Sequence, residues 1–431
     1  MYKKIVLLFL LISFGCVLLA QGIEPGENLT LKIAVIGPGD PLYFWWGHIA
    51  LVIEDSYTGR SQFFDYGIFS FDDENFFYNF ALGRLLYSCG VSPSELNYEV
   101  YRRTNRDIVL YTLDLPPQTR IKVRDFAMFN ILPENRDYFY HHFKDNCSTR
   151  IRDIIDLATD GQFKKRFAQE TGRFTLREHV RRHTWFSPPV DWILNFWMGQ
   201  VIDTPITVWE DMFLPSEVGR VIEDFYYIDV NGKKRKLVSS VDTIFRSQGR
   251  PAVLDVPGKQ WPAQLAFSLA VSAIFGFFFY LQSKNKKISR VLAGFSMSLC
   301  GLVFGIASLM LFFMNIFTNH DYTYQNFNMI FGTPLLLASV PFGIGYALTK
   351  KTNRLFLYDQ LLRIIWLLSA LGIIISMLIK LLPWFYQQNL TDQLLMLPLS
   401  LLFACQPVGL KDVLNKYFPK KNPDASGSGR G

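Results

Sequence analysis

One cysteine in the first half of the chain stands where a nucleophile would be activated. Cys147 lies in the run Asp145-Asn146-Cys147-Ser148-Thr149-Arg150, directly before the helical pattern of residues 151–157. We expect Asn146 or Asp145 to cap this helix and Cys147 to lie in its first turn. A helix start presents unpaired N–H groups and a partial positive charge, which favour a thiolate over a thiol. Cys147 is therefore our candidate nucleophile.

A general base for this thiol is available at the start of a predicted strand. Residues 47–66 read as a β-hairpin, with β-branched runs on either side of the turn at residues 57–60, and His48 begins its first strand. A lone histidine in such a place is more often a surface or capping residue than a base. If the fold brings His48 to Cys147, however, the two form a papain-type dyad with the histidine first in the chain.

The dyad needs a third group that holds the imidazole in one tautomer. Asp65 is our choice, because the paired strand of the hairpin would bring it near His48. Glu54 is the alternative, although a solvated carboxylate at a strand end is the simpler interpretation of that residue.

A disulfide competes with the catalytic interpretation of Cys147. The first half, after residue 20, contains only Cys89 and Cys147, and cysteine pairs in an oxidising compartment tend to form disulfides. Sequence alone leaves a Cys89–Cys147 bond open. The four other histidines of this half have no carboxylate or thiol at metal-ligand spacing, so we expect no metal and no other cofactor; they are His141, His142, His179 and His183.

The second half consists mainly of apolar runs. The whole chain of 431 residues has 50% hydrophobic and only 19% charged residues, which excludes intrinsic disorder and disfavours a purely water-soluble protein. Five runs are long enough to span a bilayer as helices, at about 20 residues each. They cover residues 262–282, 291–316, 328–348, 361–381 and 392–410.

Charge in the loops orients these runs. Basic residues follow the first, third and fifth runs, whereas the loops at 319–328 and 383–392 lack them and carry aromatic residues instead. By the positive-inside rule, the basic loops are cytoplasmic, and the first half of the chain is exported. The net charge of +7, from 44 Lys and Arg against 37 Asp and Glu, thus reflects topology, and we expect no nucleic-acid partner.

The start of the chain agrees with export. Lys3 and Lys4 precede an apolar stretch that ends at Ala20, as in a secretory signal peptide, with an uncleaved anchor as the alternative. We therefore predict a signal or anchor at 1–20, an exported domain at 21–260, a five-span membrane domain at 261–418 and a flexible tail at 419–431.

Several motifs in order resemble a known family. Residues 46–51, 64–67 and 145–150 resemble the exported domain of the Lnb family of bacterial lipoprotein N-acyltransferases. Residues 203–205 and 212–215 are similar to its downstream motifs, as is the polar run at 319–328. The resemblance covers nearly the whole mature chain, including the five spans.

The resemblance implies an α+β exported domain with a permuted papain-like (NlpC-type) fold, followed by an all-α domain of five transmembrane helices. It also implies that His48 and Cys147 are the catalytic pair of an inner-membrane acyltransferase. Such an enzyme moves an acyl chain from a phospholipid, through a Cys147 thioester, to the α-amine of a diacylglyceryl-modified apolipoprotein. Its partners are then the phospholipid, the apolipoprotein and the membrane.

Other residues are candidates for substrate contacts. Beside the pair we expect Tyr66, Asn146 and Arg150 to contribute, although an arginine in a first helical turn often makes only a local ion pair. In the loop between the second and third spans we expect His320 and Asn326 to contribute, with a plain solvated loop as the alternative. Rival functions are a phospholipase or thioesterase, a cell-wall endopeptidase, and a non-enzymatic membrane scaffold.

Overall fold

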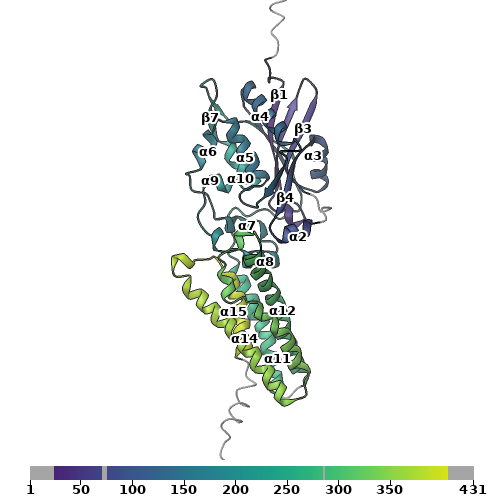
Figure 1. The fold of residues 1–431 in the computed structure, drawn as a ribbon, viewed down its shortest axis with the longest axis vertical. Helices are drawn as coiled ribbons and strands as arrows, with labels where there is room; N and C mark the ends of the chain where they lie inside the picture. The colour runs from purple at the N-terminus through teal and green to yellow at the C-terminus, as the bar shows by residue number, and fades with distance from the viewer. Residues whose placement is uncertain (1–23, 70–74, 285–286, 406–431) are drawn as a thin grey trace, which may run out of the picture. The chain divides into compact units, whose positions relative to one another are not determined.

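The computed structural model describes residues 24–69, 75–284 and 287–405, so the predicted signal or anchor and the predicted tail lie outside the described residues. The chain folds as two compact units (Figure 1). The first unit comprises the described parts of residues 1–77, 84–173 and 206–251, and the second comprises those of 78–83, 174–205 and 252–431. Segments 78–83 and 174–205 thus group with the second unit, although both precede the predicted boundary at residue 260.

The first unit is built on an antiparallel sheet of seven strands, in the order β6-β4-β3-β2-β1-β5-β9. Helices alternate with these strands along the chain, so the unit is a mixed α/β domain. The strands are β1 (Leu29–Ile36), β2 (His48–Asp55), β3 (Arg60–Ile68), β4 (Leu85–Pro93), β5 (Ile108–Leu113), β6 (Asp137–Tyr140) and β9 (Val238–Phe245), and a separate hairpin joins β7 (Tyr226–Ile228) to β8 (Lys234–Lys236).

The predicted hairpin over residues 47–66 is confirmed. Strands β2 and β3 pair antiparallel, with Ala50 opposite Asp65 and Asp55 opposite Arg60. Gly47 precedes β2 with a φ of +81°, a conformation that favours glycine, and a Cβ there would lie 2.7 Å from the carbonyl oxygen of Ile36. This turn makes His48 the first residue of the strand.

Helices cover both faces of the sheet (Figure 1). Alternate residues of β1, β2 and β3, such as Leu51 and Phe64, join a core with α4, α5 and α10, whereas their neighbours, such as Val52 and Phe63, join a second core with α3. The helices of this unit are α3 (Ser94–Arg103), α4 (Pro117–Asn130), α5 (Cys147–Ala158), α6 (Gln162–Phe167), α9 (Val208–Asp211) and α10 (Pro215–Glu223), with a 3₁₀ turn η1 (Leu42–Phe44).

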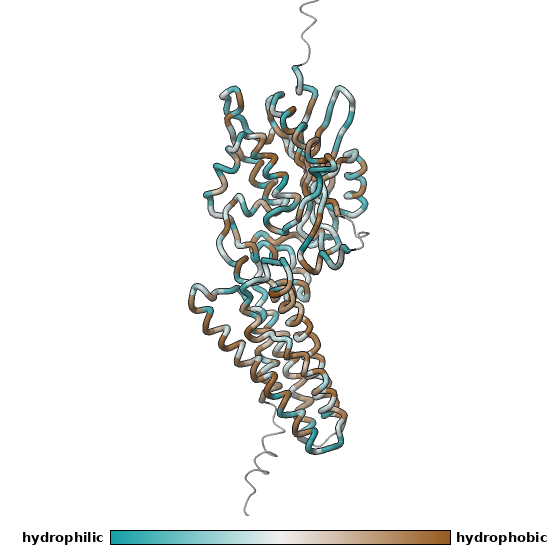
Figure 2. The backbone as a smooth tube through the Cα atoms, in the orientation of Figure 1, coloured by the Kyte–Doolittle hydropathy of each residue, from teal (hydrophilic) through white to brown (hydrophobic). Residues whose placement is uncertain are grey.

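The second unit is helical. Three of its helices are long and apolar enough to cross a membrane: α11 (Trp261–Ser283), α12 (Lys287–Phe317) and α14 (Thr352–Ile379). Figure 2 shows these helices as the most continuously hydrophobic stretches of the chain. Only 17% of the apolar window of α11 is buried inside the protein, so its remaining side chains need an apolar surrounding such as lipid. The second unit is therefore a membrane domain.

The third and fifth predicted spans form shorter apolar helices than expected, over residues 334–348 and 390–404. The third run begins as 3₁₀ turns, η4 (Phe327–Ile330) and η5 (Pro334–Ala338), before α13 (Ser339–Leu348), because Gly332 and Pro334 interrupt regular helix formation. The described part of the fifth run, α15 (Leu390–Ala404), stops before the end of the apolar run, whose last residues lie outside the described ranges. Five spans therefore stay a prediction.

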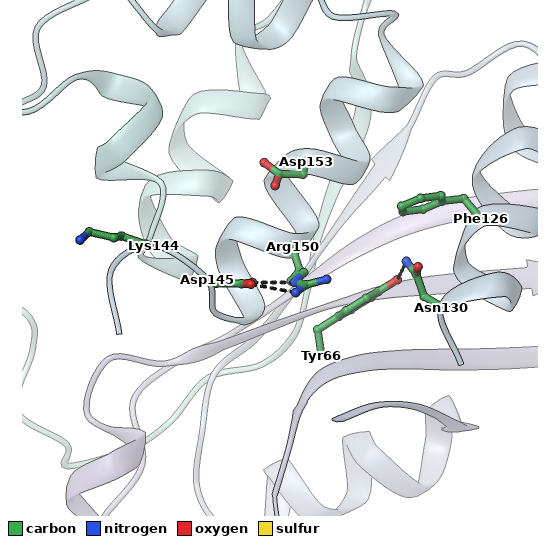
Figure 3. A pocket seen from close by; sticks show the side chains of 7 residues that line it. All are labelled: Tyr66, Phe126, Asn130, Lys144, Asp145, Arg150 and Asp153. Atoms are coloured by element: carbon green, nitrogen blue, oxygen red, sulfur yellow. Dashed lines mark hydrogen bonds and ion pairs between the residues drawn. The ribbon is translucent and has the colours of Figure 1, made fainter. Parts of the chain in front are cut away.

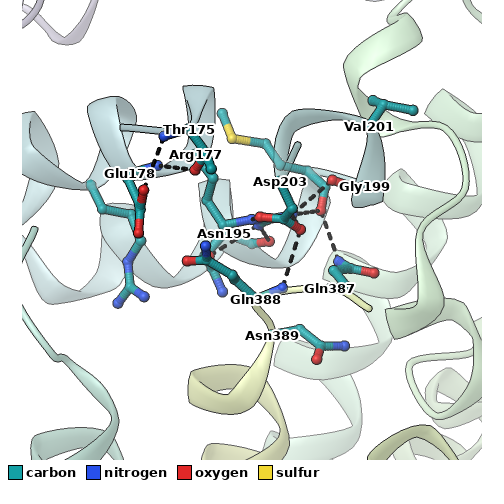
Figure 4. A network of polar contacts seen from close by, with 12 residues as sticks. Thr175, Arg177, Glu178, Asn195, Gly199, Val201, Asp203, Gln387, Gln388 and Asn389 are labelled. Atoms are coloured by element: carbon teal, nitrogen blue, oxygen red, sulfur yellow. Dashed lines mark hydrogen bonds and ion pairs between the residues drawn. The ribbon is translucent and has the colours of Figure 1, made fainter. Parts of the chain in front are cut away.

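A buried polar network links the shorter helices and turns of the second unit to one of its apolar helices (Figure 4). Arg177 is fully buried and donates to both carboxylate oxygens of Asp203, at 2.6 and 3.1 Å, and to backbone carbonyls of residues 195, 198 and 199. Asn195 in turn donates to Asp392 at 2.6 Å. The network therefore joins α7 (Leu176–Thr184), α8 (Pro188–Trp197) and η2 (Gln200–Ile202) to α15. Two further 3₁₀ turns lie in the second unit, η3 (Asp321–Thr323) and η6 (Pro383–Phe385).

Packing of α5 on the sheet predicts a large effect of one core substitution. Ile155 is fully buried between α5 and the sheet, so Ile155→Ala should lower the free energy of unfolding of the first unit by about 2–5 kcal/mol. Thermal unfolding of the purified full-length protein measures this change. Ile228→Ala, at a side chain that is 46% exposed, is the control and should alter stability by less than about 0.5 kcal/mol. Equal effects of the two changes would contradict the packing.

Candidate active site

The first turn of α5 carries Cys147 in the predicted position, and Asn146 rather than Asp145 is the cap. Asn146 Oδ1 accepts the Thr149 N–H at 3.0 Å, and Thr149 Oγ1 accepts the Asn146 N–H at 2.8 Å, which is a complete capping box. Asn146 Nδ2 also donates to the carbonyls of His142, at 2.7 Å, and Phe213, at 3.1 Å. The backbone that carries Cys147 is therefore held from three directions.

His48 is bound to Asp65 across the β2–β3 hairpin. His48 Nε2 lies 3.0 Å from Asp65 Oδ1, and the same oxygen accepts the Gly67 N–H at 2.7 Å. The two side chains are only 14% and 21% exposed. Because Nε2 is engaged by the carboxylate, Nδ1 is the ring nitrogen left for proton exchange with a thiol.

The alternative partner, Glu54, lies elsewhere. It stands near the other end of β2, where Lys32 donates to its carboxylate at 2.8 Å. Of the two carboxylates that the sequence offered for orienting the imidazole, the structure brings Asp65 to His48.

The electrostatics of the pair favour an imidazolium. Burial by itself would lower the pKa of His48, but the Asp65 carboxylate, with Tyr101 and Cys147 nearby, raises that pKa well above its usual value. Burial would likewise raise the pKa of Asp65, yet His48 and the Gly67 N–H bring it below its usual value. A protonated His48 beside an ionised Asp65 is thus the state expected near neutral pH.

Cys147 contributes to the electrostatics of His48. Cys147 is among the groups that raise the pKa of His48, and its half-buried side chain packs against the core between α5 and the sheet. Cysteine nucleophiles commonly stand at a helix start with a histidine as their proton carrier, and α5 and β2 supply these two parts here.

The disulfide that the sequence left open is not formed. Cys89 and Cys147 are both free, and Cys89 is buried. The Tyr66 hydroxyl donates to the Cys89 sulfur, and burial raises the pKa of Cys89 to about 12. Cys89 is therefore a core thiol without nucleophilic character.

Arg150 makes the local ion pair that was the alternative to a ligand role. Its Nε and Nη2 donate to the two oxygens of Asp145, at 2.6 and 2.8 Å, and its guanidinium lies 4.2 Å from the Tyr138 ring. The pair borders a pocket of about 230 Å³ (Figure 3). Its lining residues are Tyr66, Phe126, Asn130, Lys144, Asp145, Arg150 and Asp153.

Asn146, His320 and Asn326, all predicted to touch substrate, have polar side-chain atoms occupied by the protein. Asn146 serves the cap described above. His320 contacts the carbonyl of Phe80 at 3.1 Å and the Tyr322 hydroxyl at 2.9 Å, and Asn326 donates to the Phe196 carbonyl at 2.9 Å. The structure therefore gives these three side chains positioning contacts, with His320 and Asn326 inside the second unit.

Two residues beside His48 were missed by the sequence analysis. The Tyr101 ring lies 6.5 Å from the His48 ring, and the Arg106 guanidinium lies 5.1 Å from Tyr101 and 4.4 Å from Phe44. Arg106 is 1% exposed, and this burial lowers its pKa to about 10. Arg106 follows the basic end of α3 in sequence, where it reads as a solvated charge, so no local signal identifies it.

Within the described ranges, no group of three or more His, Cys, Asp or Glu side chains could hold a metal ion.

Comparison with known proteins finds one family model that matches part of the chain. Residues 24–182 match the model of the Lnb N-terminal periplasmic domain. No curated protein and no solved structure matches the chain.

The geometry predicts how His48 responds when its carboxylate partner is neutralised. In Asp65→Asn the carboxylate that raises the pKa of His48 is gone, and burial then acts against only the contributions of Tyr101 and Cys147. The pKa of His48 should therefore fall from its raised value to near or below about 6.5. Hydrogen–deuterium exchange at histidine Cε1, followed by mass spectrometry of the full-length protein, measures this pKa. An unchanged His48 pKa would show that Asp65 does not control the imidazole.

The same pair gives stability a defined pH dependence. The raised His48 pKa stabilises the fold fully below the unfolded value of about 6.5, and this contribution is lost as pH rises through the raised pKa. The lowered Asp65 pKa contributes above about 3.9 and is lost as pH falls through the folded value. Thermal unfolding across this range should therefore show a pH dependence that Asp65→Asn flattens.

Proposed function

We propose that this chain is a membrane-bound lipoprotein N-acyltransferase of the Lnb family, whose N-terminal periplasmic domain matches residues 24–182. The observation that carries the proposal is the buried His48–Asp65 pair in electrostatic range of Cys147 at a capped helix start. This arrangement suits a papain-like cysteine enzyme whose histidine precedes its cysteine. In the proposal, the first unit is the catalytic domain on the periplasmic side, and the second unit anchors it in the inner membrane by five spans.

The first half-reaction loads the enzyme. The Cys147 thiolate attacks the carbonyl carbon of an acyl ester in a phospholipid of the outer leaflet. The tetrahedral intermediate collapses, and the ester C–O bond breaks. His48 gives its proton to the departing alkoxide, which leaves as a lysophospholipid, and the acyl chain stays on Cys147 as a thioester.

The second half-reaction transfers the acyl chain. The α-amine of the diacylglyceryl-modified cysteine of an apolipoprotein attacks the thioester carbonyl and passes a proton to the now neutral His48. The C–S bond breaks, and the products are an N-acylated lipoprotein and the original thiolate–imidazolium pair. A thioester suits this step because it accepts an amine more readily than an oxygen ester does.

Backbone groups supply the oxyanion site in this scheme. Asn146 already accepts the N–H groups of Thr149, on its side chain, and Arg150, on its carbonyl. The N–H groups of Cys147 and Ser148 are then the first-turn donors for the oxyanion of each tetrahedral intermediate. Donors fixed by a helix need no reorganisation when the charge develops.

The pocket beside α5 supports a role in binding the polar part of a substrate. Arg150 shares its charge with Asp145, and Asn130 donates to the Tyr66 hydroxyl at 3.0 Å, so the lining offers both charges and neutral polar groups (Figure 3). A lipid headgroup combines a phosphate with a second polar group, which suits such a mixed lining. In this proposal Arg150 contacts the substrate, Asn146 positions Cys147, and Tyr66, which is 1% exposed, supports the wall of the pocket.

The anchoring of both substrates in one leaflet supports transfer rather than hydrolysis. A lipid donor and a lipid-anchored amine are confined to the same surface as the enzyme, which removes much of the entropic barrier to their encounter. With water in place of the amine, the same dyad would act as a phospholipase or thioesterase. Product analysis separates these reactions, because only transfer adds mass to the lipoprotein.

Four chains expressed in bacteria that lack their own N-acyltransferase test the proposal: wild type, Cys147→Ala, His48→Ala and Cys89→Ala. Wild type and Cys89→Ala should add one acyl chain to lipoprotein N-termini, because Cys89 is a buried core thiol. Cys147→Ala and His48→Ala should add none, because the nucleophile or its proton carrier is gone. Mass spectrometry of the N-terminal peptides reads the result. Acylation by Cys147→Ala would exclude Cys147 as the nucleophile.

A glycine beside the imidazole predicts a graded effect. A Cβ at Gly67 would lie 2.8 Å from His48 Cε1, so Gly67→Ala should displace the ring and lower acyl transfer by about 10- to 100-fold. Gly258→Ala, where a Cβ meets only ordinary contacts, is the matched control and should keep full activity. The same lipoprotein assay, normalised to the amount of folded protein, compares them. Equal activity of the two variants would contradict the proposed position of His48.

A further inference from the structure

A short segment between β3 and β4 belongs to the membrane domain. Residues 78–83, which include most of α2 (Phe76–Ala81), group with the apolar helices rather than with the sheet. The Asn319 N–H donates to the Leu82 carbonyl at 2.9 Å, and His320 Nε2 contacts the Phe80 carbonyl at 3.1 Å. The segment is therefore seated on the residues that directly follow α12.

Gly83 allows the backbone of this segment to approach the backbone of residues 319 and 320 closely. Its φ of +72° favours glycine, and a Cβ at this position would lie 3.0 Å from both the Asn319 carbonyl carbon and the His320 nitrogen. The two backbones thus touch, which fixes the height of the segment relative to the end of α12.

The end of α12 marks the membrane boundary on the exported side. Its last apolar side chains stay exposed, with Phe313 at 41%, Ile316 at 52% and Phe317 at 61%. The chain then becomes polar, and residues 319–328 contain no Lys or Arg, as expected for a loop on the exported side. The hydrocarbon region therefore ends near Phe317.

Segment 78–83 presents aromatic side chains at this same level. The Phe80 ring lies 6.5 Å from the His320 ring, only three residues beyond Phe317. Tyr78 is 65% exposed and Phe80 is 46% exposed. In water, such exposure leaves apolar area uncovered, whereas tyrosine and phenylalanine rings at the headgroup level are stabilised by lipid.

We propose that residues 78–83 are an interfacial anchor, with Tyr78 and Phe80 inserted among the phospholipids of the outer leaflet. The occupant of this aromatic surface is lipid, because the segment is continuous with the exported end of a membrane-spanning helix. The inference rests on the exported orientation in the proposed function but not on acyl transfer. It deepens that function, because the leaflet that would hold Tyr78 and Phe80 is also the source of the proposed phospholipid donor.

Photo-crosslinking tests the anchor. The full-length protein, with p-benzoyl-phenylalanine in place of Phe80 or Tyr78, is placed in nanodiscs of phosphatidylethanolamine and phosphatidylglycerol and irradiated. Phe313, an exposed residue of α12, is the positive control. Tyr57, 80% exposed in the β2–β3 turn, is the matched negative control, since it belongs to the sheet domain and not to the membrane domain.

Mass spectrometry should find phospholipid adducts at positions 78, 80 and 313, in several-fold excess over position 57. Adducts at 313 without adducts at 78 and 80 would overturn the proposal, as would equal labelling at 57. A cross-link from position 80 to a second polypeptide would also overturn it, in favour of a protein contact. Thermal unfolding of each labelled chain checks that it folds.

The two proposals fail separately. Photo-crosslinking requires no turnover, so the Cys147→Ala chain labelled at position 80 should give the same lipid adduct as the active chain. Lipid adducts in a protein that transfers no acyl chain would count against the proposed function alone. Acyl transfer by a protein without lipid adducts at 78 and 80 would count against the anchor alone.

Discussion

The candidate site depends on one buried charge pair within a β-hairpin. An imidazole and a carboxylate removed from water lose much hydration, and the pair is stable only if its geometry and its remaining hydrogen bonds offset that cost. Asp65 meets this condition by accepting from both His48 and the Gly67 N–H. The absence of a side chain at Gly67 leaves the ring its place. The hairpin thus fixes the tautomer and the direction of His48 before Cys147 is considered.

A second constraint fixes the thiol from the other side. The Asn146 side chain joins three separate parts of the first unit: the first turn of α5, the loop at His142 and the carbonyl of Phe213 before α10. Phe213 belongs to the motif at 212–215, so this hydrogen bond links that motif to the cysteine motif. The side chain that the sequence suggested for substrate binding instead holds the candidate nucleophile in place. Likewise, Asp203 of the motif at 203–205 neutralises the buried Arg177 in the second unit.

Local patterns were enough to predict the local elements. The alternation of residues 47–66 predicted the hairpin, and the polar residues before residues 151–157 predicted the helix start at Cys147. Contacts between distant segments were beyond such patterns. Arg106 is buried between two aromatic rings only because α3 folds back on the sheet. The third apolar run was read as one helix, although Gly332 and Pro334 break its start into 3₁₀ turns. The hydropathy of a run shows that it is apolar, but it does not show where glycine and proline end one helix and begin another.

The burial of Cys89 affects whether the two cysteines of the first unit can form a disulfide. An export compartment oxidises thiols in pairs, and a chain with two accessible cysteines would tend to inactivate itself by internal bond formation. Here the Cys89 thiol lies in the sheet core and is hydrogen-bonded to Tyr66, so the sheet would have to open before Cys89 could reach Cys147. Among the described residues of the first unit, Cys147 is then the one thiol that is not buried, and the fold itself keeps the second thiol from pairing with it.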